Sequence, residues 1–243
     1  MTISPTASHQ QSDRLSALCL QLTTGSEKLQ QQAIVQLADF GNDGEQALME
    51  FLQQRQTNYP TWVDGSAYQV IARSNSPEAK KYLQTNFPHG LVALKSESDI
   101  DYTPLQKLLI SQDFQAADTL TLRLLCQLAG ASAIQRKWLY FTEVDNFPIA
   151  DLHTINTLWL IFSEGKFGFS VQRQLWLSSG KNWEKLWVQI GWKDGNNWTR
   201  YPNEFTWNLT APIGHLPLSN QLRGVRAISS LLSHSAWNSP AKN

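Results

Sequence analysis

Apolar residues in the first ninety positions recur at intervals of three and four, which is the spacing of amphipathic helices. The predicted apolar faces are Leu15, Leu18 and Leu22, then Ile34, Leu37 and Phe40, then Leu48, Phe51 and Leu52. A further helix should start at Ser76-Pro77-Glu78, where serine can cap and proline can take the first helical position. Helices this short cannot bury their faces alone. Residues 1–90 are therefore predicted to form a helical-repeat-like bundle.

Residues 91–101 are predicted to be a linker, and helical spacing resumes in residues 102–243. Helices are expected after a capping box at Thr103-Pro104, from about Asp113 to Gly130, after a cap at Asp151, from Ser170 to Gly180 and from Asn182 to Gly191. A last helix should begin at a Ser219 cap and run to about Ser233, burying Leu222, Val225, Ile228 and Leu232. Since no segment alternates as a strand, we expect an all-α fold whose second domain is a multi-helix core.

The stretch from Trp192 to Leu218 lacks helical spacing and forms a long irregular loop rich in aromatic residues. Structureless connections of this length within compact domains are usually functional. Trp192 and Trp207 are expected to fold back onto the core, while other aromatic residues of the loop line an apolar site for a flat ligand.

Composition and charge exclude several classes of function. Twenty basic and twenty acidic residues balance, which disfavours nucleic-acid binding. The longest apolar run, Leu158 to Phe162, is far too short to span a membrane. We find no nucleophile–base motif and no metal-ligand spacing among the histidines and cysteines. We therefore expect a non-catalytic binding protein of the cytoplasm without a metal site, with at most peripheral association with a membrane.

Asn220, Arg223 and Arg226 fall at intervals of three in the last predicted helix, roughly opposite its apolar stripe. Arginines on a polar face are usually only solvated. These follow the aromatic loop directly, and arginines beside an aromatic cleft suit a flat ligand with carboxylate edges.

Five segments together closely resemble the Genomes Uncoupled family of magnesium-chelatase regulators, in its cyanobacterial form. They are QRKWLYFTEV (135–144), DLHTINTLW (151–159), FGFSVQRQLWL (167–177), GWKDGNNWTRYP (191–202) and HLPLSNQLRGVRA (215–227). The resemblance implies an all-helical core that binds protoporphyrin IX and magnesium protoporphyrin IX in its palm. It also implies association with the large porphyrin-binding subunit of magnesium chelatase, and stimulation of magnesium insertion in chlorophyll biosynthesis.

The resemblance also assigns residues. The palm arginines correspond to Arg223 and Arg226, and the mobile aromatic loop corresponds to Trp198, Arg200, Tyr201 and Phe205. Tyr201 stands where relatives often carry tryptophan. Phe141, within the first matching segment, is assigned to the same site, and Asn220 is our candidate for an axial ligand to the magnesium of a bound porphyrin.

Two other functions stay open at this stage. The chain could be a cytoplasmic carbohydrate- or peptide-binding module that uses exposed tryptophans and asparagines. An enzyme with Glu143 and Asp145 as acid and base is a weaker alternative, because these carboxylates more simply mark a helix end.

Overall fold

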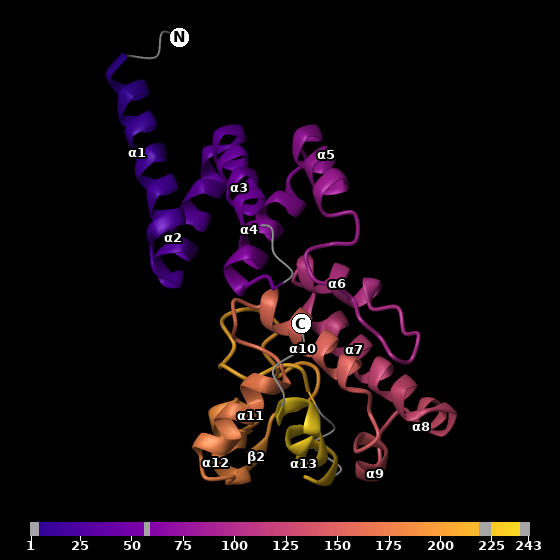
Figure 1. Cartoon of the computed structure of the whole chain (residues 1–243). Coiled ribbons are helices and arrows are strands. Elements are labelled where there is room, and N and C mark those ends of the chain that lie inside the picture. The colour runs from indigo at the N-terminus through magenta and orange to yellow at the C-terminus, as the bar shows by residue number, and fades with distance from the viewer. Residues whose placement is uncertain (1–4, 56–58, 219–224, 239–243) are drawn as a thin grey trace. The chain divides into compact units, whose positions relative to one another are not determined.

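The computed structural model describes residues 5–55, 59–218 and 225–238, and it divides into two compact units, Met1–Val92 and Ala93–Asn243 (Figure 1). Both are built from helices, which confirms the predicted all-α class. The described residues contain one pair of two-residue strands, antiparallel, with Lys193 opposite Trp198. This small hairpin was not predicted, because two residues are too few to show alternation. No helix in the described ranges is both long and apolar enough to cross a membrane.

The N-terminal unit consists of five α-helices and a 3₁₀ turn within its described residues: α1 (Pro5–Thr24), α2 (Glu27–Leu37), η1 (Ala38–Phe40), α3 (Asn42–Gln54), α4 (Trp62–Arg73) and α5 (Pro77–Asn86). Most of the predicted apolar residues are buried, among them Leu22, Leu37 and Leu48. The predicted start of α5 is confirmed, since the Ser76 hydroxyl accepts a hydrogen bond from the N–H of Ala79 at 3.2 Å.

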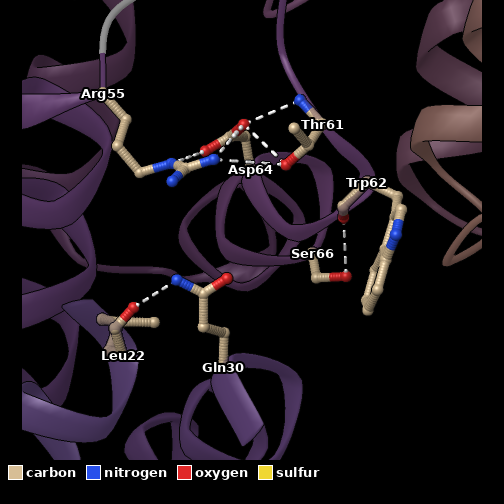
Figure 2. Close-up of polar contacts among 7 residues, drawn as sticks. All are labelled: Leu22, Gln30, Arg55, Thr61, Trp62, Asp64 and Ser66. Atoms are coloured by element: carbon tan, nitrogen blue, oxygen red, sulfur yellow. Dashed lines mark hydrogen bonds and ion pairs between the residues drawn. The ribbon is translucent and has the colours of Figure 1, made fainter. Parts of the chain in front are cut away.

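One ion pair fixes the start of α4 (Figure 2). Arg55 Nε donates to Asp64 Oδ1 at 2.7 Å, while Asp64 Oδ2 accepts from the N–H of Thr61 at 2.7 Å. Asp64 is the third residue of α4 and only 2% exposed. A buried carboxylate needs such donors because burial alone destabilises its charge.

The C-terminal unit holds the remaining elements. They are α6 (Thr103–Ile110), α7 (Phe114–Ala129), α8 (Ala131–Arg136), α9 (Phe141–Val144), α10 (Ile149–Ile161), α11 (Phe169–Ser178), α12 (Trp183–Gln189), β1 (Lys193–Asp194), β2 (Asn197–Trp198), α13 (Arg226–Ser233) and η3 (Ser235–Asn238). Its centre is aromatic: the ring of Phe114 stacks on Trp159 at 6.0 Å and meets Phe167 edge-on at 5.4 Å.

A row of stacked indoles joins α11 to α12 and the hairpin. Ring centroids are 4.8 Å apart for Trp176 and Trp183, 5.2 Å for Trp183 and Trp187, and 5.4 Å for Trp187 and Trp192. Trp176, Trp187 and Trp192 of this row are buried and belong to the core, as does Trp159.

Two predicted helix starts are wrong, and a third falls outside the described residues. Thr103 is the first residue of α6 rather than its cap, because Asp101 Oδ1 accepts its N–H. Asp151 lies inside α10, and its buried carboxylate binds the hydroxyls of Ser96 and Tyr102 instead of capping the helix. The start predicted at Ser219 lies outside the described residues, and described helix begins at Arg226. Val225, predicted to be buried, is 38% exposed because it precedes that helix, whereas Ile228 and Leu232 are buried.

Candidate functional site

An apolar cavity of about 320 Å³ lies in the C-terminal unit. Its lining comes from α7, from the connection of α8 to α9, from α9 itself and from α13: Leu122, Leu125, Trp138, Leu139, Tyr140, Phe141, Val144, Leu218, Arg226, Ala227 and Leu231. A volume in this range is typical of sites for small organic ligands. The exposure of Tyr140 (47%) and Phe141 (38%) shows that the cavity opens to solvent.

Packing between distant segments creates this cavity. Helix α13 lies against α9, from which it is far removed in sequence (Figure 1). Ile228, Leu231 and Leu232 anchor α13, each at most 2% exposed. Leu125 of α7 is also buried and forms part of the opposite lining.

Among the described lining residues Arg226 is the one that carries a charge, and it is exposed at the start of α13. Its guanidinium carbon lies 5.6 Å from the centroid of the Phe141 ring. At an exposed site such a cation–π contact contributes about 0.5–1 kcal/mol. The donors of the guanidinium can still bind a carboxylate at the edge of an apolar ligand. The structure thus brings together two of the residues that the sequence assigned to a site, Arg226 and Phe141.

A buried carboxylate holds the segment that reaches the cavity from the aromatic loop. Asp118 Oδ1, on α7, accepts the N–H of Leu218 at 2.6 Å. Burial raises the pKa of Asp118 from its ordinary 3.8 to about 7, and the bond from Leu218 acts in the opposite direction. Among the described residues no ion pair includes Asp118, so the bond from Leu218 offsets the burial of its charge only in part.

The predicted aromatic loop folds back through His215. His215 Nδ1 donates to the carbonyl of Ile190 at 2.6 Å, so Nε2 is free to accept the N–H of Thr206 at 3.2 Å. Burial lowers the pKa of His215, against the opposing effect of the Ile190 carbonyl. Gly214 has φ +79°, and a Cβ there would meet Leu175 Cδ1 at 2.7 Å, so only glycine fits this turn.

The other loop residues assigned to a site do not line this cavity. Phe205 is 5% exposed and packs against the His215 ring at 5.3 Å, because His215 draws the loop inward. Trp198 is half-buried, with its ring 5.9 Å from Trp187. Tyr201 is 52% exposed, and its hydroxyl lies 3.3 Å from that of Thr119 on α7. Arg200 is exposed.

Asn220 and Arg223 lie outside the described residues. As predicted, Trp192 is fully buried; Trp207 is half-buried and donates from Nε1 to the carbonyl of Pro202 at 2.9 Å. In the described ranges no group of three or more histidine, cysteine or acidic side chains could hold a metal ion.

Sequence reasoning missed most of the lining, including Trp138, Leu139 and Tyr140. The sequence feature that could have indicated these residues is the apolar run from Trp138 to Phe141, which lies between two helical segments too short to bury it. It also missed Leu122, Leu125 and Leu218, whose role depends on tertiary packing.

Two family models match the chain. The GUN4-like model covers residues 95–235, and the model of an ARM-like repeat domain, the GUN4 N-terminal domain, covers residues 6–88. The second agrees with the helical-repeat bundle expected from the sequence.

Relatives and solved structures agree with these models. A Ycf53-like protein of Synechocystis sp. is 52% identical over 93% of this chain and 98% of its own length. The chloroplastic tetrapyrrole-binding protein of Arabidopsis thaliana is 39% identical over 55% of this chain and 54% of its own.

The structure of GUN4 from Chlamydomonas reinhardtii superposes with a TM-score of 0.57 at 40% identity, over 61% of this chain and 95% of that one. The ligand-free structure of Arabidopsis thaliana GUN4 superposes with a TM-score of 0.53 at 38% identity, over 59% of this chain and 98% of that one. With a family model matched over more than half its residues and a relative similar along nearly its whole length, the chain belongs to the GUN4-like family.

Proposed function

We propose that this protein binds protoporphyrin IX and magnesium protoporphyrin IX in the cavity between α7, α9 and α13, and that it stimulates magnesium chelatase as a non-catalytic regulator. One observation carries the proposal: in the described part of the chain, an open apolar cavity with an aromatic wall has one charged lining residue, the cation Arg226, at its edge. A porphyrin is a flat apolar disc whose two propionates lie on one side. Its shape and charge match that arrangement.

The energetics of binding are sufficient for a ligand that must also be released. Burying one face of the disc removes about 200 Å² of apolar surface, worth roughly 5 kcal/mol before ordering costs. A propionate on Arg226 adds about 1.5 kcal/mol, near the lower end for charge-assisted hydrogen bonds, because Arg226 is exposed to solvent. Asn220 and Arg223, which lie outside the described residues, stay in this proposal as further ligand contacts, whereas Trp198, Arg200, Tyr201 and Phe205 do not line the cavity.

The partner in this proposal is the large porphyrin-binding subunit of magnesium chelatase. The relative named as a tetrapyrrole-binding protein supports the ligand, and the partner is what the resemblance to the family implies. A cavity that opens at Tyr140 and Phe141 lets a bound porphyrin pass to or from a second protein. No residue of the proposed site needs to act as an acid, a base or a nucleophile.

Absorbance titration tests the ligand. Adding the full chain to protoporphyrin IX should shift and sharpen the Soret band to saturation, and Arg226→Ala should weaken binding about tenfold. Stimulation is a separate test, in which purified chelatase subunits are assayed for magnesium insertion with and without the protein. A Soret band that does not respond would refute porphyrin binding, and an unchanged insertion rate would refute stimulation.

The alternative of a carbohydrate- or peptide-binding module loses its main support. It depended on exposed tryptophans, and every tryptophan in the described ranges is buried or half-buried. The same titration distinguishes the two, because a sugar- or peptide-binding module has no reason to change the porphyrin spectrum.

A further inference from the structure

The aromatic wall of the cavity lies in a segment with little secondary structure of its own. The connection from α8, a helix of six residues, to α9, a helix of four, contains Trp138, Leu139 and Tyr140, and Phe141 is the first residue of α9. All four residues from Trp138 to Phe141 line the cavity. Helices this short provide few backbone hydrogen bonds and cannot hold a partly exposed apolar segment in one conformation. Other contacts must hold it.

Arg136 makes those contacts together with Glu143. Arg136 Nη2 donates to both carboxylate oxygens of Glu143, at 2.8 and 2.7 Å, and to the carbonyl of Trp138 at 3.3 Å. Glu143 Oε2 in turn accepts the N–H of Tyr140 at 2.8 Å. The pair therefore ties the backbone at both Trp138 and Tyr140.

The same guanidinium also contacts the side chains of the wall. Its central carbon lies 4.9 Å from the Trp138 ring centroid and 4.4 Å from that of Tyr140, and these two rings are 4.4 Å apart. The side chains of Arg136 and Glu143 are 22% and 21% exposed, so solvent screens their interaction less than that of a surface pair. The Arg136–Glu143 ion pair, the backbone of the wall and the rings of Trp138 and Tyr140 thus form one cluster.

We infer that the Arg136–Glu143 pair is a positioning element that fixes the Trp138–Phe141 wall in the conformation that accepts the ligand. The inference rests on the proposed porphyrin function and adds two residues to it. Neither residue lines the cavity. They act by holding the wall in place. The conformational entropy of the wall is therefore lost when the protein folds and not when the ligand binds.

The N-terminal unit contains the same arrangement and supplies a control (Figure 2). There Arg55 pairs with Asp64, the third residue of α4, which also accepts the N–H of Thr61, and the Arg55 guanidinium lies 5.1 Å from the Phe51 ring. Glu143 is likewise the third residue of α9. Neither Arg55 nor Asp64 lines the cavity, so breaking that pair changes stability without reaching the proposed ligand site.

The test uses the full chain and protoporphyrin IX, with affinity from Soret titration and dissociation rate from transfer to excess apomyoglobin. We expect Arg136→Ala to weaken binding roughly tenfold, mainly through faster dissociation, since several wall side chains must then be ordered on binding. Arg55→Ala should bind like the wild type. Arg136→Lys should recover part of the affinity, because it keeps the charge but loses the planar guanidinium that contacts the Trp138 and Tyr140 rings.

A double-mutant cycle separates positioning from a general structural effect. If the two residues act as one unit, Arg136→Ala combined with Glu143→Gln should lose no more affinity than Arg136→Ala alone. Glu143→Gln keeps the shape of the side chain and an acceptor for Tyr140, so it serves if Arg136→Ala fails to fold.

Each outcome has a distinct meaning. A wild-type protein that does not bind porphyrin overturns the proposed function and this inference with it. If the wild type binds porphyrin, and Glu143→Gln and Arg136→Ala each bind it as tightly as the wild type, only the inference is wrong. The inference is also wrong if the losses are additive, or if Arg55→Ala weakens binding as much as Arg136→Ala.

Discussion

Asp118 on α7 accepts the N–H of Leu218 across 100 positions of sequence, at 2.6 Å, and so ties the end of the aromatic loop to the helix that lines the cavity. The carboxyl is buried, and its pKa is raised to about 7 by that burial. A buried acid with a raised pKa therefore holds Leu218, one of the residues that line the cavity.

The raised pKa of Asp118 predicts a pH-dependent stability. Because the folded state holds this proton more tightly than the unfolded chain, the contribution of Asp118 to the free energy of unfolding falls as the pH rises from about 4 to about 7. Asp118→Asn keeps the shape and an acceptor oxygen for Leu218 but carries no charge. It should therefore be more stable than the wild type by on the order of 4 kcal/mol at about pH 8, and by only about 1 kcal/mol at about pH 4.5.

Urea unfolding of both proteins at the two pH values measures this difference. A stability difference that is the same at both would show that the Asp118 carboxyl is not the titrating group.

His215 predicts a dependence of opposite sign. Its pKa is lowered by burial, and its neutral ring joins Ile190 to Thr206. That stabilisation is fully present above about pH 6.5 and is lost as the pH falls through the lowered folded value. His215→Phe keeps a ring against Phe205 but loses both hydrogen bonds, so it should cost about 1–3 kcal/mol at pH 7.5.

The cost of His215→Phe should shrink at about pH 5, where keeping the imidazole neutral destabilises the wild type. Unfolding followed by tryptophan emission at both pH values checks this, and comparison at equal pH cancels the contribution of Asp118. A cost that does not change with pH would contradict the assigned role of the neutral ring.

The core should work without the N-terminal bundle. We predict that a fragment of residues 91–243 folds and binds protoporphyrin IX with the affinity of the full chain, because every lining residue of the cavity lies within it. Circular dichroism checks folding, and Soret titration checks binding. A folded fragment whose affinity has collapsed would place part of the site in residues 1–90.

Local signals in the sequence predicted local structure well. Ser76, Asp113 and Asn182 were expected to begin helices, and each side chain accepts the N–H of the residue three positions later. Asp151 has the same chemistry but binds Ser96 and Tyr102, partners more than 45 residues away that no local pattern reveals.

The candidate site was predictable only in part, for the same reason. The sequence assigned Arg226 and Phe141 to one site, and the structure places their side chains beside each other. The resemblance assigned Phe205 to a mobile aromatic loop, yet His215 draws it into the interior. The remaining lining depends on the packing of α7, α9 and α13, which joins residues about a hundred positions apart.

The most direct test of the central claim blocks the cavity and leaves its charges unchanged. Leu122 and Leu128 are both half-buried leucines of α7, but only Leu122 lines the cavity. Leu122→Trp should fill it, and Leu128→Trp is the matched control. In a Soret titration with protoporphyrin IX, and with melting temperatures compared in parallel, we expect Leu122→Trp to weaken binding at least about tenfold. Leu128→Trp should bind like the wild type. If the folded Leu122→Trp variant binds porphyrin as tightly as the wild type, the ligand does not occupy this cavity.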